Sequence, residues 1–299
     1  MKNFLFLILI PFFAFSQSKK DTIKVFYLGG QSNMQGYGKN SELPASLNKK
    51  FKEVYIFQGN PAGDNEKNGG IGVWENLKPG HGDGFSSDGK KNKLSDKFGI
   101  ELSFAEKMQT LYPNQKIAII KYSRIGSSID SIGNQNFGSW DVDYKGKNGV
   151  NQYGFFLKTV NNALTVKDIN NDGTEDILVQ SGILWMQGES DADKTEAIAN
   201  NYYFQLKRLM DLMRAALRNN NLPVIIGKIT DSENDTDGKV WTFGELVQNA
   251  QEKYVKTDRN AAIIETTKNY KYSDKYHYDS AGYMDFGKEF ADAVFRIQK

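Results

Sequence analysis

Ser32 lies in the segment FYLGGQSNMQGYG (26–38), where a short apolar run meets a group of glycines. Residues 23–28 are β-branched, aromatic and apolar, which predicts a buried strand. The glycines around Ser32 let the backbone turn sharply and approach other groups closely. Ser32 therefore lies where a strand should end and a helix begin. A serine at this point is either a nucleophile for acyl transfer or an ordinary helix cap. From this fragment alone, the two interpretations are equally supported.

A serine nucleophile needs a base to take its proton and an acid group to orient that base. The chain contains only two histidines. His81 lies in the glycine-rich PGHGDG, which we expect to hold a ring poorly. His277 ends the segment DKYH, three residues after Asp274, so the carboxylate can reach back to the imidazole Nδ1. We predict a Ser32, His277, Asp274 triad, although D-x-x-H is frequent by chance and a surface histidine beside a helix remains the alternative.

The carbonyl that the serine attacks also needs hydrogen-bond donors for its developing negative charge. Gly126, in SRIGSS, offers a backbone N–H with no side chain in the way. Ser32 offers its own N–H at the turn. Gln187, in MQGESDAD, offers a neutral amide, although Gln187 and Gly188 alone are also consistent with a simple turn. We predict an oxyanion hole formed by Ser32, Gly126 and Gln187.

Strand-like and helix-like segments alternate along the chain, which favours a three-layer α/β fold. Several strands are apolar on both faces, as in parallel sheets covered by helices. The predicted strands are 23–28, 54–57, 116–122, 177–185, 223–229 and 262–265, and the predicted helices are 102–111, 201–218, 243–255 and 281–297. Ser32, SRIGSS, MQGESDAD and the DKYH segment each follow a strand, where open α/β sheets bind ligands. Residues 60–97 are polar and glycine-rich, and we expect a long surface excursion there.

The composition of the chain excludes several classes of site and gives no sign of some classes of partner. The chain has 299 residues, a net charge of +2 from 38 Lys and Arg against 36 Asp and Glu, and no strongly charged block. Nothing in this charge pattern indicates a nucleic acid or an anionic membrane as a partner. The chain has no cysteine, which excludes disulfides, thiol nucleophiles and thiolate metal sites. Two histidines are too few for a multi-histidine zinc site.

The N-terminus resembles a secretory signal. It has an early Lys2, an apolar run at 4–15 that is too short to span a bilayer comfortably, and a small-residue pattern at 14–16. We predict cleavage after residue 16, which makes Gln17 the new N-terminus and sends the protein to the periplasm or the exterior, free of the membrane. An uncleaved anchor is the weaker alternative. The rest, 17–299, is predicted to be one domain, since neither a repeat nor a proline-rich linker divides it.

Together these segments resemble the SGNH (GDSL-like) hydrolase superfamily, in its carbohydrate-esterase branch with sialate O-acetylesterases and acetyl xylan esterases. GQSNM (30–34) is similar to the branch's nucleophile block, and WMQGESDA (185–192) to its W-x-Q-G-E-S-x-A block. DKYH (274–277) resembles the Asp-x-x-His block. FGIELSFA (98–105) resembles a helix that begins Gly-Pro-Glu, with Ile100 in the place of proline. The resemblance extends over about residues 23–298.

The resemblance implies a flavodoxin-like α/β/α sandwich with a mostly parallel, five-stranded central sheet. It also implies a serine esterase that removes O-acetyl groups from a carbohydrate such as acetylated xylan or sialic acid, with the triad and oxyanion hole named above and without a cofactor. One block departs from the pattern. The family's Gly-Gly-Thr-Ser reads IGSS here, with Ile125 in place of the first glycine, so the Gly126 donor is kept while substrate preference is open.

Weaker signals concern substrate contacts and a loop. Gln31, Trp140 and Glu189 are candidate substrate contacts: Trp140 lies in a polar loop and could offer a flat face to a sugar ring, whereas for Glu189 a structural hydrogen-bond role is favoured over a catalytic one. DINNDGTED (168–176) has the early spacing of a calcium loop, but position twelve is Val179 rather than Glu, so a polar turn is the favoured interpretation and no metal is predicted.

Two other functions stay open at this stage. A lipase-like or short-chain acyl esterase on non-sugar esters would use the same triad, since fold alone does not decide substrate. A non-catalytic carbohydrate-binding protein would need no complete Ser32, Asp274 and His277 set. The oligomeric state and the acetylated sugar are not predicted.

Overall fold

The computed structural model describes residues 20–62, 66–133, 136–144 and 151–299. The predicted signal peptide (1–16) and Gln17 lie outside the described residues. Within that part of the chain, none of the helices combines the length and apolar character needed to cross a bilayer.

A seven-stranded sheet forms the centre of the fold, in the order β11-β10-β9-β1-β8-β3-β4. Its strands are β1 (Thr22–Gly30), β3 (Val54–Gln58), β4 (Glu75–Asn76), β8 (Lys116–Ser123), β9 (Ile177–Met186), β10 (Val224–Gly227) and β11 (Ala261–Ile264). All neighbours are parallel except β3 and β4. The predicted α/β class is confirmed and all six predicted strands form. The expected count of five is wrong, because six parallel strands and a short antiparallel edge, β4, make up the sheet.

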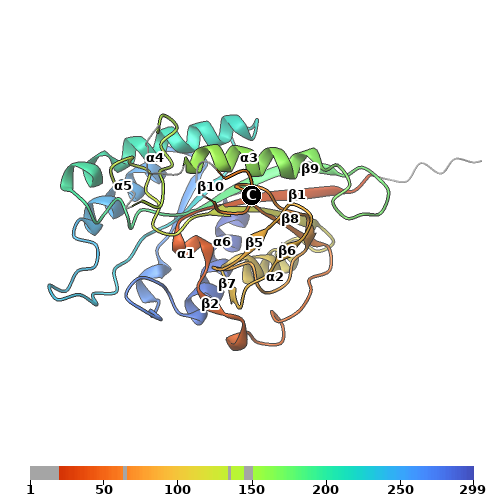
Figure 1. Cartoon of the computed structure of the whole chain (residues 1–299), viewed down its shortest axis with the longest axis horizontal. Coiled ribbons are helices and arrows are strands. Elements are labelled where there is room, and N and C mark those ends of the chain that lie inside the picture. The colour runs from red at the N-terminus through yellow and green to blue at the C-terminus, as the bar shows by residue number, and fades with distance from the viewer. Residues whose placement is uncertain (1–19, 63–65, 134–135, 145–150) are drawn as a thin grey trace, which may run out of the picture.

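Helices cover both faces of this sheet (Figure 1). On one side α2 (Glu101–Leu111) packs against α6 (Ser280–Ile297), and on the other side lie α3 (Gln152–Thr165), α4 (Glu196–Ala216) and α5 (Gly244–Thr257), with α4 against α5. Two 3-10 turns, η1 (Asn40–Glu42) and η2 (Thr266–Asn269), lie in connections. This is the predicted three-layer sandwich.

Helix α3 is absent from the sequence prediction. Its sequence, QYGFFLKTVNNALT, contains glycine, asparagines and β-branched residues that are poor helix formers. Tertiary packing outweighs these preferences, because Phe156 and Val160 are buried in the core beside β8. The Asn151 side chain caps the helix by accepting a hydrogen bond from the N–H of Gly154 at 2.7 Å.

The glycine-rich segment 60–97 is not merely a surface excursion. It contributes β4 and a small hairpin of β5 (Ser86–Ser87) and β6 (Asn92–Lys93), and the next strand, β7 (Lys97–Phe98), pairs with β2 (Gly38–Lys39). His81 is completely buried rather than loosely held. Its Nδ1 lies 2.9 Å from Gln58 Oε1, and its ring stacks on Phe85. The segment thus closes one edge of the core.

Candidate active site

The end of β1 sets the position of Ser32. Gly30 has φ +140°, and a Cβ there would lie only 1.9 Å from the carbonyl oxygen of Met186 at the end of β9. Only glycine allows this approach. The next residue, Gln31, donates its N–H to the same oxygen at 2.9 Å. The chain then turns into α1 (Ser32–Gln35), a single helical turn that starts at Ser32 itself. Ser32 is therefore not the N-cap, a position that Gln31 occupies.

The Asp274 and His277 side chains meet as the D-x-x-H spacing predicts. Asp274 Oδ2 lies 2.8 Å from His277 Nδ1, and Asp274 Oδ1 accepts the backbone N–H groups of Tyr276 and His277 at 2.7 and 2.8 Å. Burial raises the pKa of the Asp274 carboxyl, but the hydrogen bonds from His277 and from the backbone outweigh it, so the pKa lies below its ordinary value. Asp274 thus stays ionised and fixes the imidazole with Nδ1 toward itself.

Tyr37 packs flat against the same imidazole. The two ring centroids are 3.6 Å apart and the ring planes differ by 4°. Lys97 Nζ lies 4.5 Å from the centroid of the Tyr37 ring and forms an ion pair with Asp83 at 2.9 Å. Sequence reasoning missed Tyr37, although its place in the GYG end of the Ser32 segment was a usable signal.

Ser32 and His277 line one cavity of about 310 Å³, although 245 positions separate them in the chain. Gly126 lines it too, so the structure brings together the predicted nucleophile, base and backbone donor. The remaining lining residues are Gln31, Ile125, Phe137, Ser190, Asp193, Asp235, Val240, Trp241, Lys275 and Tyr276. They come from the loops after β1, β8, β9 and β10 and from the segment before α6, which is the carboxyl-end edge that the fold predicts.

Gly126 adopts a left-handed backbone conformation with φ +64°. A Cβ at this position would lie 2.4 Å from Phe137 Cδ2. Both the conformation and the space therefore require glycine. Gly126 is partly exposed and lines the cavity, and its role as an oxyanion donor stays a prediction.

Gln187 does not reach the cavity, so the predicted side-chain oxyanion donor needs correction. Its side chain is fully buried, and its Nε2 donates to Asp191 Oδ2 at 2.6 Å and to the carbonyl oxygen of Ser127 at 3.2 Å. Its Oε1 accepts from the Tyr202 hydroxyl at 3.0 Å. The hydrogen bonds of the amide thus stabilise the loop that carries Gly126. The sequence placed Gln187 at the correct strand end but could not show which way it points.

Asn33 links the segment of Ser32 to the segment of His277. Its Nδ2 donates to Glu189 Oε1 at 2.9 Å and to the carbonyl oxygen of Tyr276 at 3.1 Å. Its Oδ1 accepts from the Tyr283 hydroxyl at 2.8 Å and from the N–H of Tyr278 at 3.4 Å. One buried amide therefore joins its own segment to two distant parts of the chain, Glu189 and residues 276–283, and sequence reasoning did not select it.

Glu189 contacts the residues on both sides of Ser32. It accepts from Asn33, and its Oε2 lies 3.0 Å from the Gln31 side-chain amide, which donates to it when the amide presents its nitrogen. Burial raises the pKa of Glu189 to about 7. Glu189 does not line the cavity, so its predicted substrate contact is not seen, and the structural hydrogen-bond role holds. Gln31 does line the cavity.

The buried Asp191 carboxyl holds the loop after β8, which carries Gly126, by hydrogen bonds to its backbone. Its two oxygens accept the N–H groups of Ile129 and Asp130, each at 2.9 Å, besides the Gln187 amide. Burial raises the pKa of Asp191 to about 6, against the effect of these hydrogen bonds. The loop that offers the Gly126 backbone is therefore fixed by a buried carboxyl.

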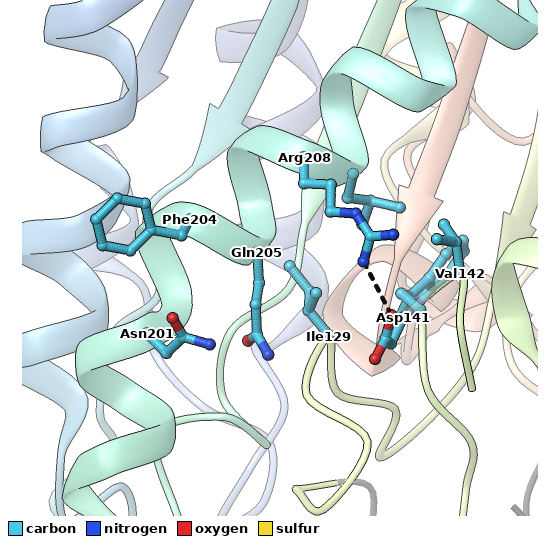
Figure 2. Close-up of a pocket in the computed structure, with 9 residues that line it drawn as sticks. Ile129, Asp141, Val142, Asn201, Phe204, Gln205 and Arg208 are labelled. Carbon is cyan, nitrogen blue, oxygen red and sulfur yellow. Dashed lines mark hydrogen bonds and ion pairs between the residues drawn. The ribbon is translucent and has the colours of Figure 1, made fainter. Parts of the chain in front are cut away.

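Trp140 is not an exposed platform, contrary to the sequence prediction. None of its surface is exposed, and its ring packs edge-on against Trp185 with centroids 4.9 Å apart, while its Nε1 donates to Ser127 Oγ. It borders a second cavity, of about 280 Å³, between α4 and the loop that carries Ile129, Asp141 and Val142 (Figure 2). The Arg208 guanidinium reaches across that cavity toward Asp141 (Figure 2). Neither Ser32 nor His277 lines it.

Residues 168–176 form a polar turn. Asp168 accepts the N–H groups of Asp172 and Gly173 at 3.2 and 2.9 Å, and Asp176 accepts the N–H of Ile169 at 2.7 Å. The carboxylates are thus engaged by the turn's own backbone. In the described part of the chain, no three His, Cys, Asp or Glu side chains form a group that could hold a metal ion.

Comparison with known proteins places the chain in a family. Residues 22–296 match the family described as carbohydrate esterase, sialic acid-specific acetylesterase. This chain belongs to that family. It is accordingly a carbohydrate acetylesterase, a carboxylic ester hydrolase, and the predicted resemblance is confirmed. No curated protein matches the chain.

Several solved structures share the fold of this carbohydrate acetylesterase. A protein from Arabidopsis thaliana has a TM-score of 0.63 at 20% identity, covering 92% of this chain and 98% of that one. A carbohydrate acetylesterase from Xanthomonas citri has a TM-score of 0.58 at 15% identity, covering 91% of this chain and 56% of that one. NanS has a TM-score of 0.58 at 15% identity, covering 94% and 98%. At these identities the likeness supports the fold.

Proposed function

We propose that this acetylesterase is a Ser-His-Asp enzyme that removes O-acetyl groups from a carbohydrate. The observation that carries the proposal is the shared cavity, in which Ser32 faces the same space as the His277 imidazole while Asp274 holds the imidazole from behind. The shared cavity supports the proposal, because serine acyl transfer needs the hydroxyl and the imidazole in one site with a carboxylate on the other ring nitrogen.

In the proposed reaction, Ser32 Oγ attacks the acetyl carbonyl carbon while His277 Nε2 accepts the hydroxyl proton. The N–H groups of Ser32 and Gly126 stabilise the oxyanion. The C–O bond to the sugar then breaks, and His277 returns the proton to the departing sugar oxygen. Water, deprotonated by His277, attacks the acetyl-serine, and release of acetate restores the Ser32 hydroxyl.

The lining of the cavity supports a sugar ester over a long acyl chain. Charged side chains, Asp193, Asp235 and Lys275, share the lining with the aromatic rings of Trp241 and Tyr276. Mixed polar and aromatic walls suit a ring that carries hydroxyl groups. Acetylated xylan and O-acetylated sialic acid are the substrate classes that we propose for test. The predicted signal peptide at 1–16 is the reason that we propose secretion or a periplasmic location, and this proposal rests on the sequence alone.

Acetate release by the Ser32→Ala variant tests the triad. Removal of the hydroxyl should lower kcat by at least about 10³-fold, because the nucleophile is lost while binding remains. The thermal melting profile should stay that of the parent. Ser41→Ala, which changes an exposed serine in η1, is the matched control and should keep parental activity. Parental acetate release by Ser32→Ala would contradict the assignment.

A further inference from the structure

One wall of the catalytic cavity is built from aromatic rings. The rings of Trp241 and Tyr276 have centroids 5.7 Å apart with planes 39° from parallel. Tyr276 keeps 43% of its surface exposed, and Trp241 is partly exposed. Tyr276 directly precedes His277, and both rings line the cavity. Aromatic faces placed beside a reacting centre present flat, apolar surfaces of the kind that pack against the C–H face of a sugar ring.

The backbone around Trp241 holds that wall in place. Asp231 accepts the N–H of Trp241 at 2.7 Å and the N–H of Val240 at 3.0 Å. On the other side of the wall, Ser232 Oγ donates to the carbonyl oxygen of Lys275 at 2.7 Å, which ties the Trp241 loop to the segment of His277. The ring is therefore supported by charge-assisted hydrogen bonds to a carboxylate and is not on a free loop.

The charged side chains of the cavity are mainly acidic. Asp193 and Asp235 line it together with Lys275. Lys275 is already engaged, since its Nζ forms an ion pair with Asp235, and its pKa is raised by Asp235 and, to a smaller extent, by Asp193. Burial raises the pKa of the Tyr37 phenol, and Arg124 is close enough to oppose that rise. The buried Arg124 Nε has no hydrogen-bond partner in the described part of the chain, but Arg124 does not line the cavity. Among the lining residues that the structure describes, Asp193, Asp235 and Lys275 together carry one net negative charge.

This charge favours one of the two proposed classes of sugar. A carboxylate-bearing sugar needs an available cation, ideally a guanidinium that can bind it in two places, and it is repelled by nearby carboxylates. A neutral sugar offers hydroxyl groups that can donate hydrogen bonds to Asp193 and to the lone pairs that Asp235 keeps beside its contacts with Lys275 and Thr236. Resting on the proposed function, we infer that Trp241, Tyr276, Asp193 and Asp235 form a sugar-binding wall that selects an uncharged acetylated sugar over an acidic one.

The first test compares three esters with the purified enzyme at low salt: ethyl acetate, acetylated xylo-oligosaccharides and 9-O-acetyl sialic acid. Ethyl acetate has no sugar and reports the acyl-transfer chemistry alone. We expect kcat/KM for the xylo-oligosaccharide ester to exceed that for the sialic acid ester by at least tenfold. Equal values, or a preference for sialic acid, would overturn the inference. Failure to hydrolyse any of the three would instead overturn the proposed function.

Asp193→Asn tests the charge part of the inference. Two like charges about 4 Å apart in water repel by about 1 kcal/mol, so removing one should raise kcat/KM for the sialic acid ester about fivefold relative to the neutral ester. Asp237→Asn is the matched control, because it makes the same change on an exposed aspartate of the neighbouring segment outside the cavity. Equal shifts in the two variants would show a general charge effect and contradict selection by the wall.

Trp241→Ala tests the aromatic part. Loss of the ring should lower kcat/KM for the xylo-oligosaccharide ester about tenfold more than for ethyl acetate, mainly through a higher KM, since a positioning effect on catalysis alone would lower both equally. Trp241→Phe keeps an aromatic face and should recover part of the preference. Equal losses on both esters with Trp241→Ala would overturn the sugar-binding role.

Discussion

The phenol ring of Tyr37 lies parallel to the His277 imidazole, with centroids 3.6 Å apart and planes 4° from parallel. The contact joins the end of the nucleophile segment to the proposed base. Together with the Asp274 hydrogen bond at Nδ1, it leaves the imidazole little freedom to tilt.

Replacing Tyr37 by leucine should therefore lower kcat about 10- to 100-fold, because a small displacement of a catalytic group is costly. Tyr37→Phe keeps the stacked ring and should lose much less. Steady-state kinetics on an acetyl ester measures both variants. A leucine variant as active as the phenylalanine variant would show that stacking does not position the base.

Asp274→Asn should reduce kcat by about 10²- to 10⁴-fold, because an amide no longer favours the Nδ1–H tautomer and no longer stabilises the imidazolium. The backbone N–H groups of Tyr276 and His277 can still bond to the carbonyl oxygen of the introduced amide, so the turn should keep its shape. Steady-state kinetics on an acetyl ester measures the loss, with Asp237→Asn as the control. A loss of kcat much smaller than this in Asp274→Asn would show that Asp274 has no catalytic role and that only Ser32 and His277 act.

The raised pKa of Glu189 should make the stability of the protein depend on pH. Its pKa is raised in the folded protein from 4.5 to about 7, so between these values the folded state binds more protons than the unfolded state. This contribution to stability is present below about pH 4.5 and is lost as the pH rises toward 7. Glu189→Gln does not titrate and can hydrogen-bond to Asn33 and Gln31 as the protonated acid does.

We therefore expect the free energy of unfolding of Glu189→Gln, relative to the parent, to increase from pH 5 to pH 8. Urea unfolding at the two pH values measures it, and the other titrating groups cancel in the difference. A relative stability that is constant with pH, or that decreases, would contradict a raised Glu189 pKa.

Lys121 and Glu101 form a fully buried ion pair, in which Lys121 Nζ lies 2.8 Å from Glu101 Oε2. Lys121 Nζ also donates to the carbonyl oxygens of Gln35, at the end of α1, and of His81. Lys121→Met should lower the free energy of unfolding, measured by urea unfolding, by about 3–5 kcal/mol, because it leaves a buried carboxylate without its partner. The double variant Lys121→Met and Glu101→Gln should recover part of the loss. A double variant less stable than Lys121→Met would contradict that explanation.

The sequence predicted the sheet and the Asp274–His277 contact because both depend on local information. Strand residues are apolar on both faces, and a three-residue spacing fixes where a carboxylate can reach. The burial of Trp140 and His81 and the direction of the Gln187 side chain were not predicted, since burial and side-chain direction depend on segments far away in the chain. Helix α3 was missed because burial of Phe156 overrides weak local propensity. The wall around Trp241 carries no motif, so only the folded chain shows it.

The Asn33 amide has a consequence for how activity appears during synthesis. Two of its partners, the Tyr276 carbonyl and the Tyr283 hydroxyl, follow it by 243 and 250 positions in the chain. A nascent chain that still lacks residues 276–283 has neither the base nor the contacts that steady the residue beside Ser32. Hydrolytic competence should therefore arise in a single step, when α6 and the segment before it dock, and chains that stop before this portion should be catalytically silent.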